Sequence, residues 1–466
     1  MKECTSLLYS LPSFTVTHEA EISTRKQTSV ITYRGKVGTP APEQCPRCGW
    51  HTLHRHQTHR IRLKHMSIAE HLVMLDVEYQ RYVCTRCGHL TSQRIPFKES
   101  GHRTSRFYAG QARWLLSGGT LTLSGCARIM HAHPSLIKDI DKKRLQRQYG
   151  DMKPTHDSRY IGVDEFSLHK GHRYATVVID LQTGEVLFLE EGNRKEQFIH
   201  FFQKAGDEWM RHVKAVAMDM NAQYDAAVRE RYPHISIVYD PFHIVKLYND
   251  KVLTMVRREE QNRLRDAMEK AKKHHDRESF RHLKQNHDYL KGSRFHLLSN
   301  MSTLTAKDKA AREHNRYLSE TYESKGLPLP PGENKRSVQN VRKLKTVLDS
   351  NEKLQMAYFL GEQLKLSLKC PDSTEMHKGL LQWIDIARAT QDEHLISYAR
   401  TVEKHLPGIL SHAVHPISNG RLEGTNTMIK TTRRAAYGYR DMKYFFLKIW
   451  ENSRRYPKSL SHRKTS

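Results

Sequence analysis

The spacing of hydrophobic and polar residues changes several times along the chain. Short runs in which the two kinds alternate, such as residues 72–84, predict strands within residues 1–99. Helical periodicity fills residues 100–150, strands and helices alternate over residues 158–250, and residues 251–466 are helical and highly charged. The pattern predicts a multidomain α+β protein.

Three strands joined by short turns open the region from residue 159 onward. Short turns favour antiparallel neighbours, so these strands form a meander. A helix then leads to a fourth strand, residues 213–219, which a crossover connection can place parallel to the first strand at its free edge. Asp164 on the first strand and Asp219 at the end of the fourth would then be neighbours, and a fifth strand follows at residues 235–240. This order is typical of the ribonuclease-H-like fold.

Asp164 and Asp219 would thus lie side by side in an otherwise apolar sheet. Two carboxylates at short range repel each other, and burial strengthens the repulsion, whereas hard divalent cations with oxygen ligands remove it. We therefore expect a pair of metal ions about 4 Å apart, a site that suits phosphoryl transfer. Taken singly, Asp164 could instead be a strand-end carboxylate bonded to backbone, and Asp219 the N-cap of the next helix. Asp180, before a turn, and Glu165, pointing opposite to Asp164, are not expected to be ligands.

Glu423 is the candidate for a third carboxylate. Helical spacing places four polar residues on one face of its helix: Glu423, Asn426, Thr427 and Lys430. Arg433 and Arg434 follow, so that Asn426, Lys430 and both arginines are candidates for DNA contacts. A metal ligand flanked by phosphate contacts fits this helix, and an exposed charge pair on its surface is the alternative.

The helical stretch before the sheet region has the pattern of a helix-turn-helix. A helix over Thr104–Leu116 precedes a short helix that begins at Ser124 as N-cap and ends at Met130; after a turn at His131–Pro134, Ser135 caps a second helix. Five basic residues lie around the outside of that second helix, where a major groove could receive them: Lys138, Lys142, Lys143, Arg144 and Arg147. An ordinary three-helix module with a solvated basic face is the alternative.

Two Cys-x-x-Cys-Gly motifs occur near the N-terminus, at Cys45 and Cys48 and at Cys84 and Cys87. Four thiolates from two such turns, with strands between them, predict a zinc ribbon with one structural Zn²⁺. The alternative is a pair of chance turns without metal. Three histidines nearby are expected at the surface, and three further cysteines are expected to be free thiols: His51, His54, His56, Cys4, Cys126 and Cys370.

The charge balance points to a polyanionic partner, because 77 Lys and Arg face 50 Asp and Glu, for a net charge of +27. A merely solvated basic surface is the alternative. No apolar run is long enough to span a membrane, and the N-terminus lacks a signal-peptide core, so we expect the protein in a reducing cytoplasm.

Four motifs together resemble the bacterial insertion-sequence transposases of the DDE type, specifically the ISL-three family. They occupy residues 162–187, 217–228, 239–247 and 419–440, and the resemblance extends over nearly the whole chain. It implies that Asp164, Asp219 and Glu423 form a catalytic triad holding two Mg²⁺ (or Mn²⁺) ions. It also implies an α-helical insertion before the Glu423 helix, and it gives Asp240 and His243 a secondary role.

The resemblance implies a function on double-stranded DNA in a bacterial nucleoid. The N-terminal modules would bind terminal inverted repeats, a water would cleave the element end, and the freed 3′ hydroxyl would attack target DNA, with a homodimer holding two ends. A domesticated DNA-binding regulator and a structure-specific nuclease of the same fold are the alternatives.

The expected domain organisation follows the order of the chain. It consists of an N-terminal region with the ribbon (1–99, ribbon about 43–90), a helix-turn-helix (100–150), the first catalytic part (158–250), an α-helical insertion (251–412), the catalytic completion (413–452) and a basic disordered tail (453–466).

Overall fold

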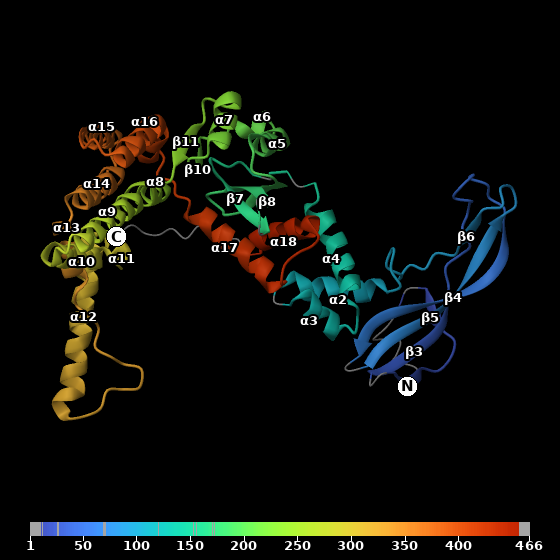
Figure 1. The fold of residues 1–466 in the computed structure, drawn as a ribbon. Helices are drawn as coiled ribbons and strands as arrows, with labels where there is room; N and C mark the ends of the chain where they lie inside the picture. Colours follow the sequence, from blue (N-terminus) through green and yellow to red (C-terminus); the bar gives the residue numbers. More distant parts are fainter. Residues whose placement is uncertain are drawn as a thin grey trace. The chain divides into compact units, whose positions relative to one another are not determined.

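The computed structural model describes residues 11–455, apart from residues 12, 26–27, 69–70, 120, 152, 155, 170 and 172 (Figure 1). Cys4 and most of the expected basic tail lie outside these residues. The chain divides into two compact units. The first unit comprises Met1–Met152 and Thr427–Pro457, and the second unit comprises Lys153–Asn426 with Lys458–Ser466.

A six-stranded sheet forms the N-terminal part of the first unit, with the order β1-β3-β5-β4, β2 on β3 and β6 on β5. Its strands are β1 (Phe14–Val16), β2 (Glu21–Arg25), β3 (Thr28–Val37), β4 (Leu53–Ile68), β5 (His71–Cys84) and β6 (Leu90–Ser92). β4 and β5 pair as a long antiparallel hairpin in which Leu63 faces Leu75. Both leucines are buried together with Val73, Val77 and Phe97, so one face of the sheet carries the core.

Helices make up the rest of the first unit: α2 (Arg106–Ser117), α3 (Leu123–Ile129), α4 (Pro134–Tyr149) and α18 (Met442–Arg454). The three predicted helices of this region are present, but two predicted N-caps are wrong. Thr122 caps α3, because its hydroxyl accepts from the Gly125 amide, and His133 caps α4. Pro134 occupies the first turn of α4, where no amide donor is needed, so the helix begins before Ser135. Ser124 likewise lies inside α3.

The second unit contains a five-stranded sheet with the order β11-β10-β7-β8-β9. Its strands are β7 (Tyr160–His169), β8 (Arg173–Asp180), β9 (Val186–Glu191), β10 (Ala215–Met218) and β11 (Ser236–Tyr239). β7, β8 and β9 form an antiparallel meander, and β10 runs parallel to both β7 and β11. The predicted strand order and the predicted parallel pairing of the first and fourth strands are therefore confirmed.

Helices α5 (Lys195–Ala205), α6 (Asp207–Met210) and α7 (Ala222–Arg231) lie together beside this sheet in Figure 1. Phe198 and Phe202 of α5 pack on each other with ring centroids 4.5 Å apart, and Phe198 also meets Tyr224 of α7 edge to face. This aromatic cluster fixes the crossover that brings β10 alongside β7.

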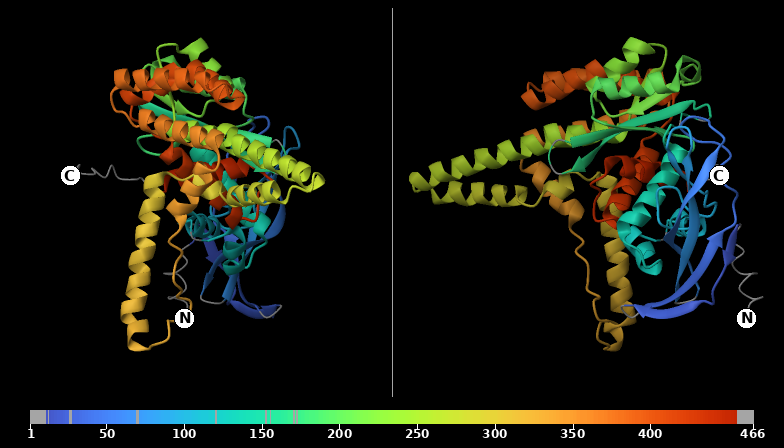
Figure 2. Two further views of the ribbon diagram at one scale, coloured as in Figure 1. Left: turned by 60° about the vertical axis from the view of Figure 1, so that its left-hand side comes forward. Right: turned by 90° about the vertical axis from the view of Figure 1, so that its right-hand side faces the viewer.

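A large helical segment completes the second unit, in the stretch where the sequence predicts an insertion. It follows α8 (Pro241–Tyr248) and consists of η1 (Asn249–Leu253, a π-helical turn), α9 (Thr254–Lys273), α10 (Arg277–Leu290), α11 (Arg294–Leu297), α12 (Met301–Thr321), η2 (Glu323–Lys325), α13 (Asn340–Asp349), α14 (Glu352–Leu368), α15 (Ser373–Ala389) and α16 (Glu393–Val414). α9 and α10 run side by side in opposite directions (Figure 2). Trp383 is fully buried, and its indole donates to the Leu360 carbonyl at 2.7 Å. No helix in the described part of the chain is long and apolar enough to cross a membrane.

Helix α17 (Gly420–Ala435) belongs to both units, because the division between them falls after Asn426. Its first turns, with Glu423, lie in the second unit, and its last turns lie in the first unit.

Candidate active site and metal centres

Asp164, within β7, and Asp219, directly after β10, lie next to each other where the parallel pairing of the two strands ends. Val163 of β7 pairs with Met218 of β10, so each aspartate is the next residue after this pair. Both border a pocket of about 480 Å³. The other polar residues around this pocket are Glu165, Asn221, Tyr224, His243, Lys246 and Asp250.

The surroundings of the two aspartates disfavour their negative charge. Burial raises the pKa of Asp164, although the Glu165 amide and the Asn426 side chain donate hydrogen bonds that oppose the rise. Burial also raises the pKa of Asp219 to about 6, and the neighbouring charges of Asp164 and Asp240 add to it, while His243 opposes it. Carboxylates held together in this way gain most from a bound cation.

Two asparagines join α17 to these aspartates. Asn426 donates to Asp164 Oδ2 at 2.6 Å, and Asn419, just before the helix, approaches Asp219 Oδ1 at 3.4 Å. Glu423 lies four residues after Asn419 and three before Asn426, on the same helical face, and its side chain is exposed. The backbone therefore directs Glu423 toward the region between the two contacts. In the described residues, however, the three carboxylates do not all approach within 4.8 Å of one another.

Asp240 and His243 both lie next to this arrangement. Asp240 is buried and caps α8, where its Oδ1 accepts from the Phe242 amide at 2.8 Å and its Oδ2 accepts from the Asn419 amide at 3.0 Å. His243 Nδ1 lies 3.1 Å from Asp219 Oδ2. Asp240 thus holds the start of α17, and His243 contacts the site directly.

Asp180 and Glu165 each have hydrogen-bond partners of their own, although Glu165 borders the same pocket as the two aspartates. Asp180 is buried and accepts from Ser158, His156 and the turn amides of Gln182 and Thr183, so its oxygens are already used. Glu165 pairs across the strands with Thr176, one residue out of step with Asp164. Its carboxylate accepts from Asn193 at 2.9 Å, although the residue also borders the pocket.

Residues of the site that were absent from the sequence prediction include Asn419, which approaches Asp219, and the pocket residues Lys246 and Asp250. Lys246 and Asp250 follow His243 at helical spacing, which is the signal that could have identified them. Asn426 was predicted as a DNA contact, and in the structure its side chain donates a hydrogen bond to Asp164.

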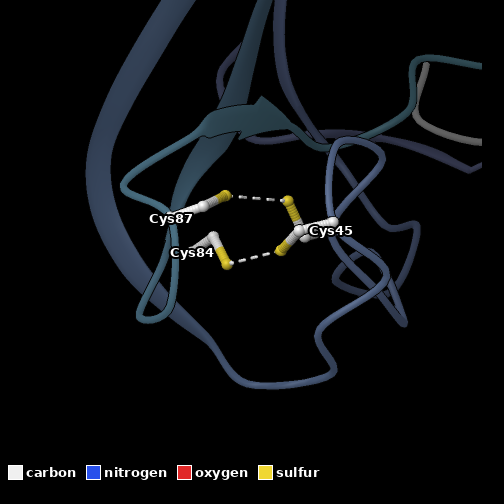
Figure 3. Close-up of side chains that lie close together, drawn as sticks. Cys45, Cys84 and Cys87 are labelled. Carbon is white, nitrogen blue, oxygen red and sulfur yellow. Dashed lines mark hydrogen bonds between the residues drawn. The ribbon is translucent and has the colours of Figure 1, made fainter.

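The four cysteines of the two motifs converge at the end of the N-terminal sheet. Sulfur atoms of Cys45 and Cys87 lie 3.7 Å apart, and those of Cys48 and Cys84 lie 3.6 Å apart (Figure 3). A tetrahedral zinc ion with bonds of about 2.3 Å has sulfur–sulfur edges of about 3.8 Å, so the spacing fits one Zn²⁺. Burial raises the pKa of the Cys84 thiol. Hydrogen bonds from the backbone amides of Cys87 and Arg86 outweigh that effect and lower the pKa to about 7. His51, His54 and His56 are exposed, as expected.

Each cysteine pair is closed by a glycine that the turn requires. The Gly49 amide donates to the Cys45 carbonyl, and the Gly88 amide donates to the Cys84 carbonyl. Both glycines have positive φ, 70° and 67°, a conformation that side chains rarely adopt. The Gly after each Cys-x-x-Cys is therefore part of the zinc-binding turn.

The basic residues of α4 lie on a less open surface than the sequence predicted. Lys138 and Lys142 both pair with Asp441, at 2.9 and 2.7 Å, and Arg144 pairs with Asp141 and Glu451, each at 2.6 Å. Lys143 lies 3.4 Å from Asp139 and is half-buried, whereas Arg147 is exposed. The cause is α18, which packs along α4 and brings acidic residues to it.

The basic residues in the last turns of α17 have different surroundings. Lys430 and Arg434 are exposed, and Arg433 is half-buried.

Comparison with known protein families gives two matches. The family model of the ISL3-type DDE transposases, described as a transposase, matches residues 161–449. A model described as the zinc-finger of the transposases of IS204, IS1001, IS1096 and IS1165 matches residues 41–87, which include all four cysteines.

Two curated proteins show the same similarity. The transposase for insertion sequence element IS1001 of Bordetella parapertussis is 29% identical over 406 residues, which is 87% of each chain. The transposase for insertion sequence element IS1557 of Mycobacterium tuberculosis is 27% identical over 290 residues, which is 60% of this chain and 57% of that protein.

Proposed function

Because the chain belongs to the ISL3-type family of DDE transposases, we propose that it cuts DNA at the ends of an insertion sequence and joins the freed 3′ hydroxyl to target DNA. The observation that carries this proposal is the pair of contacts from α17. Asn419 and Asn426 hold this helix against Asp219 and Asp164, and Glu423 lies between them on the same face. The order of the strands supports a ribonuclease-H-like catalytic domain.

Asp164, Asp219 and Glu423 are the proposed ligands of two Mg²⁺ or Mn²⁺ ions. The donor set suits these hard cations, because it consists of carboxylate oxygens, two of which have raised pKa values. When bound, such ions activate a water and stabilise the oxygen that leaves phosphorus.

The remaining residues of the site would orient the ligands and the DNA. Asn426 fixes the carboxylate plane of Asp164, and Asp240 fixes the start of α17 through the Asn419 amide. Lys246 brings positive charge to the pocket edge, where a phosphate would enter, and the His243 ring lies against Asp219.

DNA recognition is assigned to the first unit. The zinc ribbon and the helices α2, α3 and α4, the latter two as a helix-turn-helix, would bind the terminal inverted repeats, and Lys430, Arg433 and Arg434 would contact phosphates. Two element ends must be joined, so a homodimer on DNA is expected. The excess of basic over acidic residues supports a phosphate-dominated affinity.

A plasmid assay tests this function. A supercoiled donor that carries both element ends is incubated with the protein and Mg²⁺, and cleaved and joined products are separated. Asp164→Ala, Asp219→Ala and Glu423→Ala should each reduce cleavage by at least about a thousandfold, because each would remove a metal ligand that stabilises developing charge. Asp385→Ala, at an exposed position of α15, is the matched control and should cleave normally.

The same assay separates the alternatives. A DNA-binding regulator would bind the donor without cutting it, and a nuclease would cut it without joining. Full cleavage by any of the three alanine variants would remove that residue from the proposed triad.

A further inference from the structure

Ion pairs within the first unit already occupy most of the basic residues of α4. Asp441 pairs with Lys138 and Lys142, and Asp141 and Glu451 enclose Arg144. Arg147 differs, because it is exposed and makes no ion pair with any residue that the structure describes. It therefore remains available to an outside partner.

Arg147 is one of three arginines around a single pocket of about 270 Å³. Arg106, at the first position of α2, and Arg113, two turns further along the same face, complete the set. Glu99 and Ser100 form the rest of the wall. Arg106 is exposed and, like Arg147, has no ion-pair partner within the described ranges.

The pocket has an excess of positive charge that the protein itself does not neutralise. Arg113 donates to Glu99 at 2.5 Å, and Glu99 is only 6% exposed, so this pair is fixed. Arg106 and Arg147 then leave two positive charges in excess.

The wall of the pocket is well supported by backbone hydrogen bonds. The Arg106 amide donates to the Phe97 carbonyl at 2.7 Å, and the Glu99 amide donates to the Thr104 carbonyl at 2.9 Å, closing the loop that carries Ser100. Like charges on a supported wall repel one another, and an anion between them relieves the repulsion. The planar guanidinium group matches the oxygens of a phosphate in particular, with two parallel hydrogen bonds.

We propose that Arg106, Arg113 and Arg147 bind one backbone phosphate of DNA. The choice of DNA as the source of the phosphate rests on the proposed function. This site replaces the lysines of α4 as the phosphate contact of the helical module, and it adds two residues of α2 to that contact. Because a phosphate carries no base identity, the site sets the position of the module on the duplex and not its sequence preference.

A salt series on the full-length protein tests this site. The double variant Arg106→Gln with Arg147→Gln removes two charges from the exposed rim and leaves the buried Arg113–Glu99 pair intact. The control, Arg316→Gln with Arg388→Gln, removes two charges that Glu320 and Glu403 already neutralise elsewhere. Binding to a random-sequence duplex is measured from low to moderate salt, and thermal unfolding verifies that both variants are folded.

The pocket variant should bind at least about tenfold more weakly at low salt, since it loses charge-assisted hydrogen bonds to a phosphate. Its plot of log affinity against log salt should be less steep by about one phosphate contact, while the control keeps the wild-type slope. Equal slopes for the wild type and the pocket variant would overturn the proposal.

A second arm uses inorganic phosphate. If phosphate raises the unfolding temperature of the wild type and not of the pocket variant, while both bind duplex equally, the pocket takes a free anion and the DNA assignment is wrong. These outcomes are independent of catalysis. Wild-type cleavage that depends on Asp164, Asp219 and Glu423 would support the proposed function even where the pocket assignment fails.

Discussion

His65 shows how one buried side chain links the sheet of the first unit to its helices. It is 2% exposed on β4, and its Nδ1 lies 2.7 Å from the hydroxyl of Ser105, the residue that caps α2. Burial lowers the pKa of His65 to about 4. The folded protein therefore requires a neutral imidazole at this position.

The first unit should consequently lose stability in acid. The unfolded state binds a proton to His65 near its ordinary pKa of about 6.5, while the folded state does so only near 4, so stability is full above 6.5 and falls as the pH drops between these values. The loss should reach at most about 3 kcal/mol. His65→Asn, which keeps an atom near the position of Nδ1, should show a smaller drop in unfolding temperature over this range.

Exposed His56 provides the control for that measurement, because His56→Asn should leave the pH dependence unchanged. A wild type and a His65→Asn variant with the same pH dependence would show that His65 titrates normally in the folded protein.

At the candidate active site, the sequence predicted the aspartates better than their partners. Asp164 and Asp219 followed from strand order, since each directly follows the last residue pair between two neighbouring parallel strands. Asn419 and Asn426 reach them from 200 and 262 residues later, and no local pattern reports a contact across that distance. Glu423 depended on family resemblance, because its helix also allowed an ordinary surface charge.

Among the elements, the pairing of α4 with α18 had the largest effect on interpretation. Helical periodicity correctly predicted α4 and its buried Ile137, Ile140 and Leu145. Helical periodicity also predicted that the basic residues of α4 lie on its outside, which would be correct for a helix with only one buried face. α18 covers a second face, and its acidic residue Glu451 is 5% exposed between Arg144, Lys448 and Arg455. Helix α18, which is distant from α4 in the sequence, thus covers part of the surface that was expected to bind DNA.

Glu451→Gln should therefore destabilise the first unit. The amide keeps the volume but leaves three buried or half-buried cations with less compensation, and breaking a buried pair costs about 3 kcal/mol. Urea unfolding of the variant should show a lower midpoint with an unchanged slope. Glu403→Gln removes an exposed partner of Arg388 and should unfold like the wild type. A Glu451→Gln midpoint equal to that of this control would mean that the network contributes nothing to stability.

On the scale of the whole molecule, each unit contains hydrophobic core of its own. The first unit has one core in its sheet and one among α2, α3 and α4, and the large core of the second unit joins its sheet to the helical segment. The zinc ligands all belong to the first unit. Loss of zinc should accordingly affect one unit and spare the other.

Zinc removal tests this independence. The purified protein should contain about one zinc per chain, and a strong chelator should lower one calorimetric unfolding transition while leaving a second transition in place. Cys87→Ser should reproduce the shift, whereas Cys370→Ser, at an isolated thiol of the second unit, should not. A zinc-free preparation with unchanged unfolding would contradict a structural role for the metal.

The sharing of α17 between the units bears on how such proteins can diversify. The first unit is assembled from two separate stretches of the polypeptide, Met1–Met152 and Thr427–Pro457, and the main part of the second unit, Lys153–Asn426, lies between them. A single genetic crossover would therefore exchange only half of the first unit and leave α4 facing an α18 of foreign ancestry. Because the two stretches of the first unit pack against each other through α4 and α18, changes in this unit are more readily inherited as point substitutions than as an exchanged cassette.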